Sequence, residues 1–114
     1  MPRRAAGVPR TTIDLLVLAV LNEGPRHGYA LAQAIDERSQ SRARIRPGDL
    51  YRVLYRLHRA GLIEPVAARA ADDERRMRYR ITAEGRRVAR AEAAYLRDVC
   101  AALLRPAARA GRPS

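Results

Sequence analysis

The sequence contains no lysine, phenylalanine or tryptophan, and its only cysteine is Cys100. A single cysteine excludes an internal disulfide bond. The two histidines, His27 and His58, lack cysteine or carboxylate neighbours at metal-ligand spacing, so no zinc site is predicted. We therefore expect a protein without metal or cofactor, located in the reducing cytoplasm.

Long apolar segments are also missing. The longest strongly apolar run, residues 15–21, has seven residues, whereas a helix that crosses a bilayer needs about 20. The basic start, Met-Pro-Arg-Arg, is not followed by a small-residue cleavage site. These absences predict no membrane partner and no secretory signal.

Large apolar side chains are scarce for a chain of 114 residues, a length that fits one domain. The sequence has 22 alanines but only 12 leucines, seven valines and five isoleucines. A small domain with few large apolar groups often gains the missing burial from a partner subunit. This composition favours a homodimer.

Positive charge is abundant but unevenly placed. The formal net charge is +11, and all 23 basic residues are arginine. Residues 11–37 contain one arginine against four acidic residues, while residues 38–59 contain seven arginines against Asp49 alone. A basic middle beside an acidic first part is typical of a protein with one surface that faces nucleic acid. An arginine-rich surface without a partner is the alternative.

Apolar spacing, capping residues and stop signals predict four helices and a hairpin. Thr11 or Thr12 and Gly24-Pro25 bound the first helix, although its apolar run also fits a central strand. A short strand over 42–46 is possible before Pro47-Gly48, and the proline in the first hairpin strand predicts that this strand is short or lies at an edge. The predicted helices cover 12–23, 28–38, 49–60 and 83–104, and the hairpin strands cover 62–67 and 76–82.

The third helix has the clearest pattern. Leu50, Val53, Leu54 and Leu57 fall on one face at i, i+3, i+4 and i+7. On another face, arginines occur at i, i+4 and i+7, namely Arg52, Arg56 and Arg59. A helix in the major groove of DNA needs such an apolar face and an opposite face of long hydrogen-bond donors. Asp49 is interpreted as a helix cap, with a contact to cytosine as the alternative. Either tyrosine of the helix could also belong to the core.

Three helices followed by a basic hairpin are in the order of a winged helix-turn-helix. The hairpin arginines are expected over an adjacent minor groove, and the acidic residues 72–74 either hold these arginines or keep the tip off the DNA. The fold class is therefore mainly α with a small β-hairpin, and the partner is double-stranded DNA. The candidate DNA-binding residues are Arg44, Arg46, Tyr51, Arg52, Tyr55, Arg56, Arg59, Arg75, Arg76 and Arg78.

The last helix follows a complete winged unit and has a long apolar stripe, so we expect it to dimerise; otherwise it completes the core of its own domain. The expected organisation is a flexible basic arm (1–10), a winged-helix DNA-binding domain (11–82), a C-terminal dimerisation helix (83–105) and a flexible tail (106–114). The candidate dimer residues are Val88, Tyr95, Leu96, Val99 and Leu103.

Several segments together resemble the PadR family of winged-helix transcriptional regulators. They are His27-Gly28-Tyr29, Pro47-Gly48-Asp49-Leu50-Tyr51 with Leu54 and Leu57, Gly61-Leu62-Ile63, and Arg78-Tyr79-Arg80-Ile81-Thr82-Ala83-Glu84-Gly85. The resemblance covers residues 13–104 and implies a homodimer on a palindromic operator. It also implies a repressor that a small hydrophobic or aromatic effector releases. The single terminal helix resembles the family's short-form members.

Two other functions compete with DNA binding. One is a winged helix whose arginines meet an acidic protein partner, and the other is a small RNA-associated protein that uses its arginine-rich ends. An enzyme is not predicted, because the three serines have no histidine neighbour and no phosphate loop or paired carboxylates can be assembled.

Overall fold

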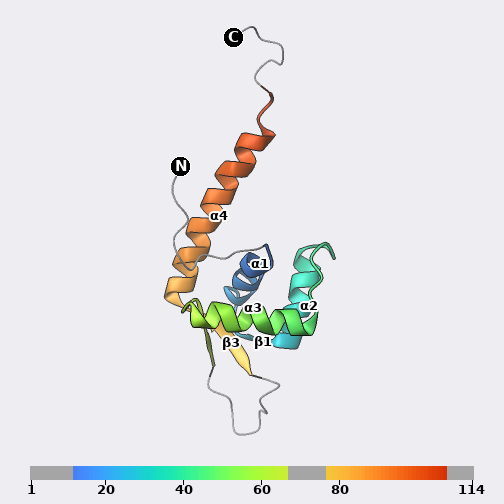
Figure 1. Ribbon diagram of the computed structural model, residues 1–114, viewed down its shortest axis with the longest axis vertical. Coiled ribbons are helices and arrows are strands. Elements are labelled where there is room, and N and C mark those ends of the chain that lie inside the picture. Colours follow the sequence, from blue (N-terminus) through green and yellow to red (C-terminus); the bar gives the residue numbers. More distant parts are fainter. Residues whose placement is uncertain (1–11, 67–76, 108–114) are drawn as a thin grey trace.

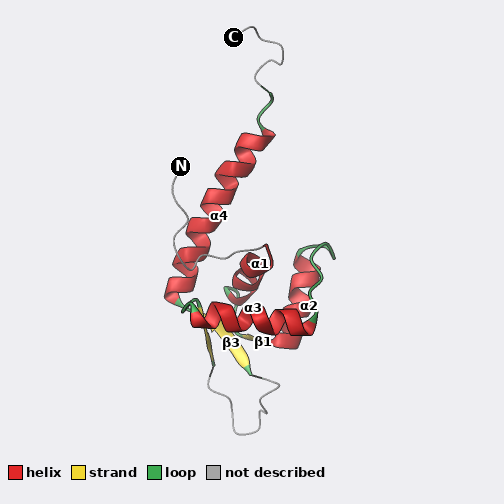
Figure 2. Ribbon diagram, viewed as in Figure 1, coloured by secondary structure: helices red, strands yellow, loops and turns green. Residues whose placement is uncertain are grey.

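The computed structural model describes residues 12–66 and 77–107. These residues form four helices and a small antiparallel sheet, with α1 to α3 gathered against the sheet and α4 extending away from them (Figures 1 and 2). The elements are α1 (Thr12–Leu21), β1 (Arg26–His27), α2 (Gly28–Arg38), α3 (Pro47–Arg59), β2 (Ile63–Pro65), β3 (Arg78–Ile81) and α4 (Ala83–Leu104).

The core lies between the first three helices, the sheet and the first turns of α4. Helix α1 is apolar on most sides, and this explains why it sits in the centre of the fold. Helix α3 turns its leucine face toward it. The buried apolar side chains are Val17, Leu18, Val20, Leu21, Leu31, Ile35, Leu50, Leu54, Leu57, Leu62, Ile63, Ile81 and Val88.

The sheet has three strands in the order β1-β3-β2, all antiparallel. Ile63 pairs with Ile81, and Pro65 pairs with Tyr79. Strand β2 is short and lies at the edge, as the missing N–H of Pro65 predicts. Strand β1 was not predicted: its two residues, Arg26 and His27, are too few to show an alternating pattern.

Four sequence predictions need correction. Residues 42–46 form no strand but an irregular connection into α3. The N-cap of α3 is Arg46, followed by Pro47, so Asp49 lies inside the first turn and is not the cap. The first helix ends at Leu21, two residues early, and β2 ends at Pro65 and not at residue 67.

Two junctions were predicted correctly and hold the wing to the helices. Gly61 ends α3 with φ +77, and the Leu62 amide donates to the Leu57 carbonyl at 3.0 Å in a Schellman motif. Thr82 caps α4, because its Oγ1 accepts from the Gly85 amide at 2.9 Å. Any side chain at Gly85 would overlap the Leu62 carbonyl oxygen. Glycine is therefore required where α4 leaves the sheet.

Two absences hold within residues 12–66 and 77–107. No helix there has the length and apolar character of a membrane span. No three His, Cys, Asp or Glu side chains in this part gather where a metal ion could be held. The hairpin tip, both chain ends and their predicted flexibility lie outside the described residues.

Candidate nucleic-acid interface

The outer face of α3 carries four exposed polar side chains. Tyr51 and Tyr55 are 52 % and 64 % exposed, and Arg52 and Arg59 are also exposed. The Arg59 guanidinium lies 5.9 Å from the centre of the Tyr55 ring, and its Nη1 donates to the Tyr55 hydroxyl at 3.5 Å. The two tyrosines are therefore surface residues and not core residues, which the sequence had left open.

Arg56 does not share this exposed face. Its two terminal nitrogens, Nη1 and Nη2, donate to Asp14 of α1 at 2.6 and 2.7 Å. The Asp14 carboxylate is fully buried. The hydrogen bond to Asp14 raises the pKa of Arg56 above its usual value. The structure thus separates Arg56 from Arg52 and Arg59, with which the sequence pattern had grouped it.

Two arginines, Arg44 and Arg46, precede α3 in the connection from α2. Arg44 has an exposed side chain, and its Nε lies 3.7 Å from Asp36 Oδ1, which is beyond hydrogen-bond distance. Arg46 is exposed at the N-cap of α3. Both side chains are available to a ligand that approaches the start of this helix.

Of the three arginines predicted to bind DNA from the hairpin, Arg78 lies in the described part of the chain. Arg78 in β3 is half-buried. Arg80, two residues further along the same strand, donates from Nε to the Glu64 carboxylate of β2 at 2.7 Å. Arg75 and Arg76, two predicted contacts, lie outside the described residues.

One exposed aromatic side chain was missed. Tyr29, in the first turn of α2, is 76 % exposed, and its hydroxyl accepts from Gln33 Nε2 at 3.4 Å. The preceding Gly28 lies against Tyr51 of α3, so close that an added Cβ would be 3.3 Å from the tyrosine hydroxyl. The motif His27-Gly28-Tyr29 carried the signal, but it was used for the resemblance and not for the site.

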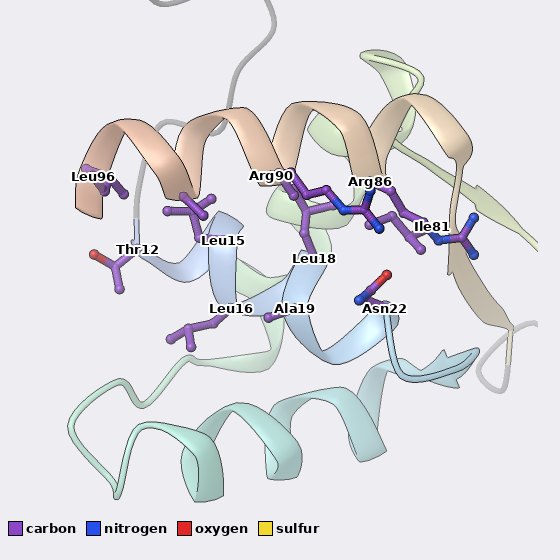
Figure 3. A pocket seen from close by; sticks show the side chains of 12 residues that line it. Thr12, Leu15, Leu16, Leu18, Ala19, Asn22, Ile81, Arg86, Arg90 and Leu96 are labelled. Carbon is purple, nitrogen blue, oxygen red and sulfur yellow. The ribbon is translucent and has the colours of Figure 1, made fainter. Parts of the chain in front are cut away.

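An apolar groove of about 460 Å³ separates α1 from the first half of α4 (Figure 3). Arg86 and Arg90 extend from α4 beside it, and Leu15 of α1 points toward α4. Leu96, a predicted dimer residue, lines its far end.

The stripe of predicted dimer residues on α4 runs from buried to exposed. Val88 is 7 % exposed and belongs to the core of its own chain. Tyr95, Leu96 and Val99 are half-buried. Beyond them Leu103 is 79 % exposed. The structure therefore leaves the distal part of the stripe open and covers its beginning.

The model of the transcriptional regulator PadR-like family matches residues 17–91. The chain belongs to the PadR-like family. Since this is a family of transcriptional regulators, membership agrees with the expectation of a function other than catalysis. The match begins inside α1 and ends inside α4, so it includes all of α3 and part of the groove lining.

Solved structures of similar proteins support the winged-helix fold of this PadR-like chain. A transcriptional regulator from Clostridium thermocellum superposes with a TM-score of 0.70 at 25 % identity, covering 80 % of this chain and 85 % of that one. A PadR family regulator from Eggerthella lenta gives 0.69 at 31 % identity, covering 81 % and 78 %. Bacillus subtilis PadR in complex with operator DNA gives 0.61 at 18 % identity, covering 70 % and 45 %, and supports the fold alone.

Proposed function

We propose that this PadR-like regulator binds double-stranded DNA sequence-specifically through the outer face of α3. The observation that carries the proposal is the row formed by Tyr51, Arg52, Tyr55 and Arg59. These side chains are exposed, whereas the leucines on the other side of the helix are buried in the core. Such a helix can enter the major groove and remain held by its own domain.

The exposed residues divide into two roles by their place on the helix. Arg52 and Arg59 have long donors that reach base edges, where arginine contacts guanine O6 and N7. Arg44, Arg46 and the hydroxyls of Tyr29 and Tyr51 surround the start of α3 and contact phosphates. Phosphate contacts fix the register of the protein, and base contacts select the sequence.

Two copies of the chain bind a palindromic operator in this proposal. The exposed end of the α4 stripe, from Val99 to Leu104, and the apolar groove beside α1 are covered by the second copy. A two-fold dimer then presents two α3 helices about 34 Å apart to successive major grooves. The family resemblance supplies the further proposals of repression and of release by a small hydrophobic or aromatic effector.

Selection from a random duplex pool by the purified protein tests the proposal. Salt of about 0.15 M weakens non-specific phosphate binding. We expect a two-fold symmetric consensus, which Arg52→Ala weakens and the control variant Arg97→Ala does not, because Arg97 lies on distal α4 beside Asp98. Binding without a consensus, or binding of RNA in its place, contradicts the proposal. Absence of binding also contradicts the proposal and turns attention to a protein partner.

A further inference from the structure

Asp14 of α1 and Arg56 of α3, which are 42 residues apart in the sequence, form an ion pair that links the two helices. Asp14 lies in the first turn of α1, at the centre of the fold, and is fully buried. Arg56 lies in the second half of α3 with 32 % of its side chain exposed. The Arg56 guanidinium points toward the core, whereas Arg52 and Arg59 of the same helix are exposed to solvent.

The geometry conflicts with a role in base recognition. An arginine that contacts guanine bidentately uses two of its N–H donors in a fork. Both terminal nitrogens of Arg56 already serve the two oxygens of Asp14. Moving the guanidinium to DNA would break both of these hydrogen bonds to the fully buried Asp14 carboxylate, and breaking a buried ion pair is strongly destabilising.

The pair also supplies what the apolar contacts of α3 lack. Leu50, Leu54 and Leu57 bury the inner face of the helix, but apolar attraction is non-directional and tolerates rotation of the helix about its axis. A bidentate ion pair has a fixed geometry. It therefore sets the angle at which α3 presents its outer face.

We propose that Arg56 is a positioning residue, which holds α3 against α1 through Asp14 so that Arg52 and Arg59 meet the base edges. This inference rests on the proposed function. It assigns sequence discrimination to the exposed row on α3 and removes Arg56 from the residues that contact bases.

Variants of both partners test the proposal on the duplex that the wild-type protein selects and on its single-base-pair substitutions. Arg56→Met is expected to weaken binding about tenfold and to reduce discrimination at every position of each half-site. Adding Asp14→Leu replaces the pair by apolar groups and is expected to restore the folding stability. It is not expected to restore discrimination, because apolar contact does not fix the angle of α3. The matched control, Arg52→Met, loses discrimination at one position, and Asp14→Leu does not restore it.

Circular dichroism shows whether each variant folds. If the larger changes prevent folding, Asp14→Asn tests the proposal in their place, because it keeps the size of the side chain. Freed from the carboxylate, Arg56 is expected to leave α3 less well held, so discrimination falls at all positions. An unchanged or sharper preference in Asp14→Asn overturns the positioning role, as does loss of one base preference in the double variant. A wild-type protein that selects no duplex overturns the proposed function itself.

Discussion

Helices α3 and α4 are both amphipathic and rich in arginine, but their apolar faces differ in burial. On α3 Leu54 and Leu57 are buried by α1, α2 and the sheet of the same chain. On α4 only the beginning is buried, at Val88, and the end exposes Leu103 and Leu104 by 79 % and 82 %. The apolar face of α3 is thus covered within the chain, whereas the apolar face of α4 is left exposed at its end.

This difference indicates which surface meets which partner. A helix whose apolar face is buried within its own domain has its polar face free for a ligand, and on α3 this is the face that we propose for DNA. A helix with an uncovered apolar end gains most from a second copy of itself, because burying that end removes apolar surface from water. The contrast gives four predictions.

The largest effect is expected from a charge on the uncovered part of α4. Val99→Arg places a guanidinium in the proposed dimer contact, so the protein is expected to sediment as a monomer. Operator affinity falls about 100-fold or more, because the second half-site is no longer bound by a linked copy. Ala101→Arg is the matched control, since it adds the same charge about half a turn away. A dimer that persists in Val99→Arg contradicts the assignment of this face.

The next effect concerns the covered face of α3. Leu54→Ala removes a fully buried side chain and is expected to lower the free energy of unfolding by about 2 to 5 kcal/mol. Urea unfolding monitored by circular dichroism measures this loss. Leu104→Ala is the comparison: its effect should be smaller and should vanish on dilution, because it acts only through the second copy. Equal losses at both leucines would show that the two helices do not differ as described.

Much of the fold follows from local signals that need no long-range information. Thr82, Gly61 and the leucine spacing of α3 placed the helix ends within two residues of those observed, because caps and periodicity act over one or two turns. Strand β1 escaped prediction because Arg26 and His27 pair only through β3, which lies 50 residues further along the chain. Residues 42–46 alternate like a strand, yet the three described strands do not include them.

The candidate site shows the same limit. Helical spacing correctly placed Arg52 and Arg59 on the exposed side, but it also placed Arg56 with them. Arg56 lies at the border of that face, on the side of Val53, and its direction is decided by Asp14 on another helix. Spacing within one helix cannot show a partner on another. Tyr29 was missed for a related reason, since its importance depends on the contact of the preceding Gly28 with Tyr51.

A smaller effect is expected at a base contact of α3. Arg52→Ala should weaken operator binding by about 1 to 3 kcal/mol and relax the preference at one position of each half-site. Arg44→Ala should weaken all duplexes alike and reduce the salt dependence, because it removes a phosphate contact. Titrations of both variants with the selected duplex and its substitutions distinguish the two patterns. A uniform loss for Arg52→Ala would place that side chain on the backbone.

The smallest effect comes from the exposed pair at the start of α4, where Arg87 Nε donates to Glu84 at 2.8 Å. This hydrogen bond lowers the pKa of Glu84 below its usual value of 4.5. The unfolded state therefore binds more protons in this range, so the stabilisation is complete above pH 4.5 and is lost as the pH falls through the lower, folded-state value. Unfolding in urea between about pH 6 and pH 3 should show a shallower decline for Arg87→Gln than for the wild type. The difference is expected to be slight, because water screens an exposed pair, and a steeper decline in the variant would contradict the assignment. The pair lies next to Gly85, where α4 leaves the sheet. Arg87→Gln is therefore expected to leave the dimer unchanged, in contrast to Val99→Arg at the other end of the same helix.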